Sequence, residues 1–282
     1  MSTSTEPIRV LALPGFGQTG DMMLGKMYKL RKVFGDDIDV VAMDPPMILG
    51  HPTVHFGAAQ QPLTYEEEYL GWWRRDYTHS FKGDYVAFEF ALRAFRNFVQ
   101  EHGPFDAVIG FSQGGNALVH FLPLLEKPWL HPITSGLSHI YSPRTSISAS
   151  SDDSTTSVSS AMSVSSSSPP LSPAATEFFG RSRQSSIGEE DVWPLRPFKC
   201  VVLVGAYGPA DPLMDTWFDT PVTVPALCYI GKNDAWIPPN HQVDTAAKFV
   251  NSKILWHIGG HFIPQAHEYH VAMRDFIIKH CS

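Results

Sequence analysis

Short, almost wholly apolar runs alternate along the chain with longer segments in which apolar residues recur at helical spacing. Six such runs are present, at residues 8–13, 38–43, 107–109, 200–204, 226–230 and 254–258. Strands that are buried on both faces have this composition, as in a parallel sheet covered by helices. We therefore expect these runs to form the strands of one mostly parallel sheet.

The segments between the runs predict helices at residues 84–101, 116–126, 244–250 and 267–279. In the longest of them, Phe88, Leu92 and Phe95 recur at helical spacing before a Gly-Pro pair ends the pattern. Pro123 is expected to kink or shorten the second helix, because proline cannot donate in the helix interior. The alternation of strand and helix predicts an α/β fold with helices on both faces of the sheet.

One region departs from this alternation. From Ser135 to Ser186 the chain has 20 serines, several prolines and few large apolar residues. Such a segment buries too little apolar surface to offset the entropy of ordering it. We predict a disordered insertion over residues 134–190 within a single domain of residues 1–282, because long surface insertions cost little stability.

The insertion supports two interpretations. Ser142, Ser168 and Ser172 each precede a proline, and arginines stand among the serines of residues 181–186. Phosphorylation would add about −1.5 to −2 charges at each modified site, which would make the segment a regulated arm. The simpler interpretation is a passive, solvated spacer, and the sequence leaves both open.

Charge and composition exclude several classes of partner. The formal net charge is −7 and the basic residues do not gather into a patch, so we expect neither nucleic acid nor an anionic membrane surface as partner. No apolar run reaches the roughly 18–20 residues of a membrane span, and the N-terminus does not resemble a secretory signal. The three cysteines, Cys200, Cys228 and Cys281, show no metal-ligand spacing, which predicts free thiols in a reducing compartment, the cytoplasm.

The stretch Gly110–Gly114 reads G-F-S-Q-G and matches G-x-S-x-G, the nucleophile elbow. In an elbow the chain turns so tightly from strand to helix that the serine is strained and its neighbours must be small. The pattern alone is weak, since glycine and serine are common residues. Here a buried-strand pattern precedes it and a helical pattern follows it, so we predict that Ser112 is a nucleophile.

A serine hydroxyl needs a base within hydrogen-bond reach and a carboxylate that orients this base. In α/β-hydrolases these follow in the order Ser, Asp or Glu, His. Asp234 comes directly after the fifth predicted strand and His261 directly after the sixth, where open α/β sheets place their sites. We therefore predict a triad of Ser112, His261 and Asp234.

Other residues compete for these roles. Asp211, which follows the fourth predicted strand, is an alternative acid. His257 falls inside a strand pattern and is expected to be a satisfied core histidine, whereas His267 and His270 are expected to be solvated on the last helix. The stretch His267-Glu-Tyr-His270 lacks the spacing of H-E-x-x-H, so we expect no metal site. The predicted chemistry requires no cofactor.

Acyl transfer also requires two N–H donors aimed at the developing oxyanion. The main chain of Gln113, the residue after the nucleophile, is the expected source of one donor. Residues 14–18 close the first predicted strand and are rich in glycine, and the Phe16 N–H is the expected second donor. Alternatively, this loop is an ordinary turn that closes the strand. A phosphate-binding loop is not indicated, because the sequence matches neither G-x-G-x-x-G nor a Walker motif.

With these residues in place, the chain resembles the FSH family of serine hydrolases. The matching stretches are residues 9–18, 72–76, 103–114, 230–234 with 237–239, and 259–264, distributed over nearly the whole chain outside the Ser-rich insertion. The resemblance implies an α/β-hydrolase fold and a triad of Ser112, Asp234 and His261. Two features depart from the family. Pro14 stands where the family usually has histidine, and the insertion is longer than usual.

The resemblance also implies a reaction class. It is the hydrolysis of carboxylic esters or thioesters, and some fungal members act as thioesterases or hydrolases of polyketide pathways in secondary metabolism. An acyl substrate predicts an apolar pocket beside the serine. The aromatic candidates to line it are Phe16, Tyr69, Trp72, Trp73, Phe111, Trp236 and Phe262.

We predict a serine hydrolase that cleaves an ester or thioester of an apolar acyl chain through an acyl-enzyme. One alternative is a pathway-specific thioesterase that releases a polyketide from an acyl carrier protein. Another is a non-catalytic binding protein on a hydrolase fold, with the Ser-rich segment as a phosphorylation-regulated docking arm. The presence of Ser, Asp and His in the required order argues against this last alternative.

Overall fold

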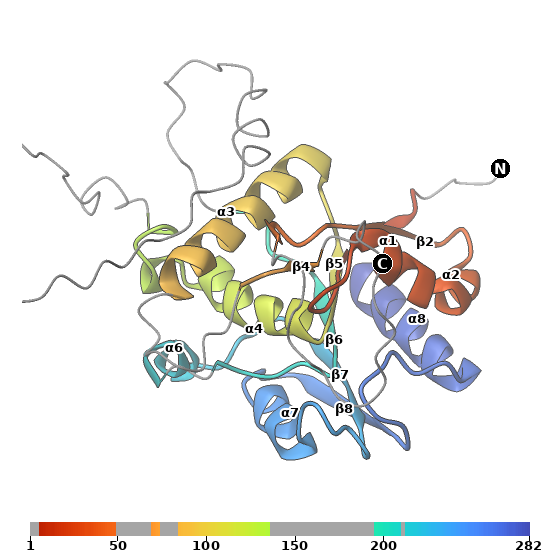
Figure 1. The fold of residues 1–282 in the computed structure, drawn as a ribbon. Helices are drawn as coiled ribbons and strands as arrows, with labels where there is room; N and C mark the ends of the chain where they lie inside the picture. The colour runs from red at the N-terminus through yellow and green to blue at the C-terminus, as the bar shows by residue number, and fades with distance from the viewer. Residues whose placement is uncertain (1–5, 49–68, 74–83, 136–194, 210–211) are drawn as a thin grey trace, which may run out of the picture. The chain divides into compact units, whose positions relative to one another are not determined.

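The computed structural model of the chain describes residues 6–48, 69–73, 84–135, 195–209 and 212–282 (Figure 1). The predicted insertion lies outside the described residues from position 136 onward, and so does Asp211. Thr134 and Ser135, the first two positions predicted for the insertion, are described. They close a turn in which both main-chain N–H groups donate to the His131 carbonyl.

Six strands form one sheet. In chain order they are β1 (Ile8–Leu13), β2 (Ile38–Ala42), β5 (Ala107–Phe111), β6 (Cys200–Val204), β7 (Ala226–Gly231) and β8 (Ser252–His257). They lie side by side in the order β2-β1-β5-β6-β7-β8, and every neighbouring pair is parallel. Two short strands, β3 (Met47–Ile48) and β4 (Leu70–Gly71), form a separate antiparallel pair. The parallel strands therefore direct all their carboxyl ends to one edge of the sheet.

The helices of the described residues connect these strands. They are α1 (Gly20–Lys26), α2 (Tyr28–Phe34), α3 (Asp84–His102), α4 (Gln113–Glu126), α6 (Pro212–Asp215), α7 (Pro239–Ala246) and α8 (His267–Cys281), with the 3-10 turns η1 (Pro128–Leu130) and η2 (Thr216–Phe218). Within the described ranges, every helix is too short or too polar to cross a bilayer.

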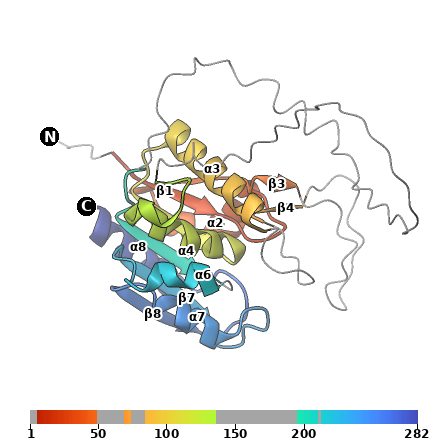
Figure 2. The same ribbon diagram turned by 90° about the vertical axis from the view of Figure 1, so that its left-hand side faces the viewer.

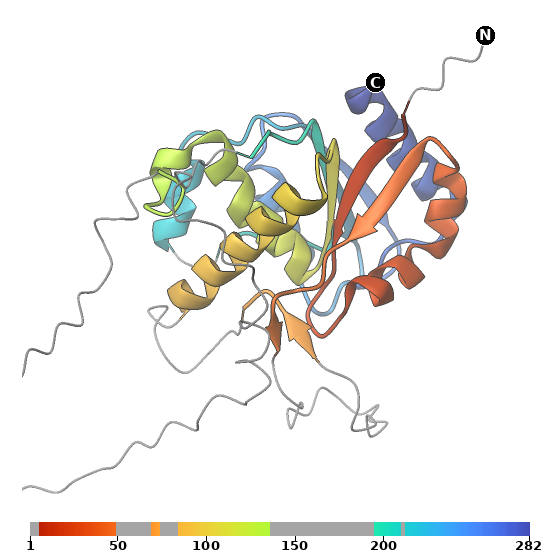
Figure 3. The same cartoon turned by 90° about the horizontal axis from the view of Figure 1, so that it is seen from above.

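Each face of the sheet carries its own hydrophobic core, and helices cover both faces (Figures 2 and 3). One core packs α3 and α4 against strand residues such as Leu13 and Val108. The other packs α1, α2 and α8 against strand residues such as Ala12 and Ile109. Figure 3 shows the yellow and green helices on one side of the sheet and the red and violet-blue helices on the other. Because alternate residues of a strand point to opposite faces, a strand between two cores is apolar at nearly every position.

The structure confirms the α/β fold and all six predicted strands, with some ends shifted by one or two residues. Pro123 lies inside α4, which continues to Glu126, so the expected shortening is wrong. The helix predicted at residues 244–250 is wrong in position, because α7 begins at Pro239, where proline suits the first turn. The predictions also omitted α1 and α2, which have seven residues each.

All three cysteines are buried free thiols, as predicted. The sulfur atoms of Cys200 and Cys281 lie 3.9 Å apart, so the last residue of α8 contacts the first residue of β6. Burial raises the pKa of the Cys228 thiol to about 12. All three cysteines are members of the two hydrophobic cores, where a buried thiol packs as a small apolar side chain.

Candidate active site

Ser112 lies at the turn between β5 and α4, at the carboxyl edge of the sheet. Its backbone has φ 52° and ψ −119°, and it is the one non-glycine residue of the described ranges with positive φ. Such a conformation costs on the order of 1–3 kcal/mol and persists only where the surroundings enforce it. A Cβ on Gly114 would lie 2.2 Å from the Leu13 carbonyl oxygen, so only glycine lets α4 approach β1 this closely. This is the geometry of a nucleophile elbow.

The side chains of Ser112, His261 and Asp234 form one chain of hydrogen bonds. Ser112 Oγ lies 2.8 Å from His261 Nε2, and His261 Nδ1 lies 2.8 Å from Asp234 Oδ2. Because an ionised carboxylate only accepts, the proton belongs on Nδ1, and Nε2 then accepts the Ser112 hydroxyl. The side chains of His261 and Asp234 are 13% and 1% exposed. Water therefore competes little for these bonds.

The carboxylate of Asp234 accepts four hydrogen bonds. Oδ1 accepts from the main-chain N–H groups of Trp236 and Ile237, both at 2.9 Å. Oδ2 accepts from Gln242 Nε2, also at 2.9 Å, in addition to His261. The carboxylate is thus oriented by the turn that follows β7 and by a side chain of α7. Gln242 was not predicted as a site residue, because its only local signal is a polar residue on the buried face of a short helix.

Gly205 and Phe111 hold the imidazole of His261 in place. Gly205 directly follows β6 with φ +59°, and a Cβ there would lie 2.9 Å from His261 Cε1. The ring centroids of Phe111 and His261 are 5.2 Å apart. Gly205 was not predicted as a site residue. A glycine directly after a buried strand was the available signal, but the contact with His261 arises only in the folded chain.

The loop of residues 14–18, here called the donor loop, passes directly over Ser112. A Cβ on Gly15 would lie 3.1 Å from Ser112 Cβ, so any side chain there would crowd Ser112. Phe16 is the next residue of this loop. Gln113 is the first residue of α4, and an N–H at that position has no acceptor within the helix. The structure thus brings the loop of one predicted donor and the helix start of the other to the same serine.

Three of the predicted pocket residues are buried in the cores. Trp72, Trp73 and Phe111 are 0%, 7% and 4% exposed. Trp72 and Trp73 pack in the core under α3 and α4, where the ring of Trp73 lies 5.3 Å from that of His120. With so little exposed surface, these three residues are poorly placed to line a substrate pocket in this structure.

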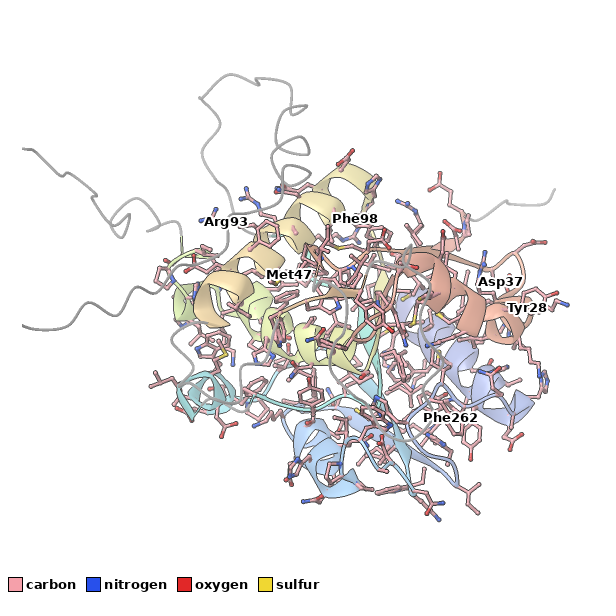
Figure 4. The ribbon with its side chains drawn as sticks, in the orientation of Figure 1. Tyr28, Asp37, Met47, Arg93, Phe98 and Phe262 are labelled. Carbon is pink, nitrogen blue, oxygen red and sulfur yellow. The ribbon has the colours of Figure 1, made fainter. Side chains whose placement is uncertain are left out.

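Three other predicted aromatic residues remain accessible. Phe16, Trp236 and Phe262 are 42%, 63% and 46% exposed, and they follow β1, β7 and β8 at the same edge of the sheet as Ser112. Figure 4 labels Phe262 on the segment between β8 and α8. Its ring lies against Gly259, where a Cβ would meet it at 2.0 Å. The ring of Tyr69 packs on Gly17 of the donor loop.

The predictions for the competing histidines are correct in part. His257 is a buried core histidine at the end of β8, as predicted. Its Nδ1, however, has no hydrogen-bond partner among the described residues, so the expectation that its ring nitrogens are all hydrogen-bonded is wrong. Burial lowers the pKa of His257, although the negative charge of Asp234 acts to raise it. His267 is exposed, as expected. His270 is 2% exposed and its Nε2 bonds to the Pro264 carbonyl at 2.9 Å, so the expectation of a solvated side chain is wrong.

No group of three or more His, Cys, Asp or Glu side chains in the described parts of the chain is arranged to hold a metal ion. Every polar group assigned to the site above is a side chain or a main-chain N–H of the protein itself.

The chain is similar to known hydrolases. A family model described as serine hydrolase (FSH1) matches residues 1–187 and 180–273. Esterase OVCA2 of Danio rerio is 23% identical over 285 residues, which cover 97% of this chain and 98% of that protein. Esterase OVCA2 of Mus musculus is 24% identical over 284 residues, with 96% of each chain covered. The crystal structure of Zea mays acyl-protein thioesterase 2 shares the fold, with a TM-score of 0.54, 13% identity, and coverage of 100% of this chain and 97% of that one. The chain belongs to the FSH1 family of serine hydrolases.

Proposed function

We propose that the protein is a serine esterase or thioesterase in which Ser112 is the nucleophile, His261 the general base and Asp234 the orienting acid. The observation that carries this proposal is the unbroken chain of hydrogen bonds from Ser112 Oγ through both nitrogens of His261 to Asp234 Oδ2, each 2.8 Å long. Membership of the serine hydrolase family supports the reaction class.

In the acylation half of the reaction, His261 Nε2 takes the proton of the Ser112 hydroxyl as Oγ attacks the substrate carbonyl. Asp234 stabilises the imidazolium that forms and keeps the ring in the productive tautomer. The tetrahedral intermediate then collapses, and His261 gives its proton to the leaving alcohol or thiol. The acyl group stays on Ser112 as an ester.

In the deacylation half, water takes the place of the leaving group. His261 removes a proton from this water, which attacks the acyl carbonyl, and the proton returns to Ser112 Oγ as the carboxylic acid leaves. Both halves use the same groups and need no cofactor.

Two main-chain donors stabilise the negative oxygen of each tetrahedral intermediate in this proposal. They are the N–H of Gln113 and the N–H of Phe16. The close approach of the donor loop to Ser112, 3.1 Å for a Cβ on Gly15, supports the assignment. Removal of one such donor from a serine hydrolase typically costs about 10²–10³ in kcat.

We propose that the substrate is an ester or thioester with an apolar acyl chain. The exposed rings of Phe16, Trp236 and Phe262 support this choice, because they come from three loops at the edge of the sheet that carries Ser112. Relatives named as esterases and a structural neighbour named as an acyl-protein thioesterase are consistent with it.

The catalytic assignment is tested by hydrolysis of short p-nitrophenyl esters. We expect Ser112→Ala and His261→Ala each to lower kcat by about 10³-fold or more, while the exposed histidine variant His267→Ala keeps the wild-type rate. Circular dichroism and thermal melts show whether each variant is folded. A folded Ser112→Ala variant with wild-type kcat would contradict the proposal.

The acyl chain and the leaving group are tested with two matched series. Esters of increasing acyl length locate the optimum, and we expect kcat/KM to rise with length beyond acetyl and to fall when Phe262 is replaced by alanine. Acyl-pantetheine thioesters compared with the same acyl group on a carrier protein test the second candidate, a thioesterase that releases a polyketide from its carrier. A rate gain of about tenfold or more on the carrier would favour that candidate.

Three buried free thiols support a further part of the proposal, a reducing location such as the cytoplasm. Fractionation of the native cells with antibody detection tests it. Recovery from the medium or from an oxidising compartment would contradict it.

A further inference from the structure

We infer that Trp72 and the side chain of Gln113 are positioning residues that hold the donor loop in the shape needed to stabilise the oxyanion. Residues 69–73 are here called the strap. Together with the Gln113 side chain, the strap forms a frame of hydrogen bonds around the donor loop. The inference rests on the proposed function, because it concerns how the Phe16 N–H is aimed. Neither side chain is expected to touch the substrate.

Trp72 fixes the donor loop on the N-terminal side of Phe16. Its indole Nε1–H donates to the Pro14 carbonyl oxygen at 2.9 Å, and the side chain is 0% exposed. Proline has no N–H and a restricted φ, so its carbonyl is the one main-chain group through which the loop can be held at this position. The bond sets the plane of the peptide that joins Pro14 to Gly15, one peptide before the Phe16 N–H.

The strap also fixes the loop on the C-terminal side of Phe16. The Gly17 N–H donates to the Leu70 carbonyl at 2.7 Å. Gly17 has φ +71°, and a Cβ there would lie 2.9 Å from the ring of Tyr69. The Gly15–Phe16 peptide, which carries the Phe16 N–H, thus lies between two peptides that are each bonded to the strap, so the direction of this N–H is set from both sides.

Gln113 ties the strap to the nucleophile elbow. Its side-chain Oε1 accepts from the main-chain N–H of Trp72 at 3.0 Å, and its Nε2 donates to the main-chain carbonyl of Trp73 at 2.8 Å. The residue is 4% exposed, so water does not compete for these bonds. One residue therefore supplies the first proposed oxyanion donor through its main chain and fixes the second through its side chain.

The frame explains why two buried side chains, Gln113 and Trp72, carry hydrogen-bonding groups, an amide and an indole N–H. A buried hydrogen bond that is part of a connected network is rigid, and a rigid network holds donors where charge develops. Loss of one member lets the loop relax by a fraction of an ångström. A misplacement of this kind lowers the rate of the chemical step and leaves ground-state binding nearly unchanged.

The test compares two identical substitutions in the same core. Trp72→Phe removes the indole donor to Pro14 and keeps an aromatic ring. Trp217→Phe makes the same change at a tryptophan that is 7% exposed and belongs to the same hydrophobic cluster, on η2 and outside the proposed machinery. We expect Trp72→Phe to lower kcat on a p-nitrophenyl ester by about tenfold or more with KM within about twofold, and Trp217→Phe to keep kcat.

Two further readouts separate positioning from a structural role. A trifluoromethyl ketone that forms a tetrahedral adduct with the serine should lose affinity in Trp72→Phe by the same factor as kcat/KM, while the pH profile of kcat keeps its shape. If Trp72→Phe does not fold, Gln113→Met provides the test. This substitution removes both side-chain hydrogen bonds to the strap and keeps the main-chain N–H, and it should give the same pattern of kcat, KM and inhibitor affinity.

Equal kcat for the folded variants Trp72→Phe and Trp217→Phe would overturn the inference and leave the proposed function intact, as would a wild-type kcat for Gln113→Met. A wild-type protein that is folded but neither hydrolyses the ester nor reacts with a fluorophosphonate would contradict the proposed function itself. The two failures are therefore distinguishable.

Discussion

The side chains that meet at Ser112 are positioned by residues far away in the sequence. His261 bonds to a serine 149 positions before it and to an aspartate 27 positions before it. The order of Ser, Asp and His along the chain, together with the place of Asp234 and His261 directly after two predicted strands, led to the prediction that these three residues meet. Gly205 and Gln242 were missed, because packing against His261 or Asp234 leaves no periodic pattern. Trp72 was predicted as a pocket residue because its ring is large and apolar, and only the structure shows its indole donating to Pro14.

Gly205→Ala should inactivate the enzyme by displacing His261. Alanine at φ +59° is strained, and its Cβ would lie 2.9 Å from the imidazole. We expect kcat to fall by about 10²-fold, together with a loss of about 1–2 kcal/mol in the free energy of unfolding. Ester hydrolysis and urea denaturation measure the two effects.

Gly35→Ala is the matched control for this substitution. Gly35 also has φ +59°, but nothing lies within 4 Å of its ideal Cβ. It should therefore show a similar loss of stability and an unchanged kcat. If both variants lose activity equally, backbone strain and not contact with His261 is the cause.

Gln242→Met should weaken catalysis through Asp234. The substitution removes the donor to Oδ2 and also removes Oε1, a buried atom without a partner among the described residues. A hydrogen bond to a charged group contributes about 1.5–3 kcal/mol, so we expect kcat/KM to fall by about tenfold. Because Gln242 Nε2 also donates to the Ile237 carbonyl at 2.7 Å, we also expect a loss of about 1–3 kcal/mol in the free energy of unfolding. Steady-state kinetics and thermal melts check this, with Gln100→Met on the exposed side of α3 as control. An unchanged kcat/KM in a folded Gln242→Met variant would show that the other three donors suffice.

The four central strands could be predicted from sequence because they lie between two cores. β1, β5, β6 and β7 are apolar on both faces, which makes their pattern strong over a few residues. The short helices α1 and α2 give too few turns for a clear helical period. The start of α7 was misplaced because its N-terminal residues are polar, and the two-residue strands β3 and β4 depend on a pairing that no local pattern reports.

Glu126 at the end of α4 should stabilise the segment that leads into β7. Its carboxylate accepts from the main-chain N–H groups of Thr223 and Val224 and from the Thr223 hydroxyl. Glu126→Ala removes this acceptor, and because the Thr223 donors are exposed and can turn to water, we expect a loss of about 0.5–1.5 kcal/mol in the free energy of unfolding. Chemical denaturation measures it. Glu101→Ala on α3, where the side chain is 76% exposed, serves as control and should change stability by less than about 0.5 kcal/mol.

The packed cores also determine how the folded protein responds to acid. His131, His257 and His270 are buried, and burial lowers the pKa of each. In the unfolded chain a histidine titrates near pH 6.5. Below this pH the unfolded chain therefore binds more protons than the folded protein, and stability rises with pH across this range.

The free energy of unfolding should consequently fall as the pH is lowered from about 7 through 6.5 and below. Urea denaturation at successive pH values measures the slope. His270→Gln, which removes one buried imidazole, should give a shallower slope than the wild type. His267→Gln on the exposed side of α8 should keep it. A slope that is the same in all three proteins would show that the buried histidines do not control acid stability.

The central claim of this account is that Ser112 is an activated nucleophile, and the most direct measurement is mass spectrometry of the folded protein after reaction with a fluorophosphonate. We predict one phosphonyl group per chain, located by peptide mapping on Ser112, and no labelling of Ser112→Ala or His261→Ala. A folded wild-type protein that stays unlabelled, or a label on another residue, would contradict the claim.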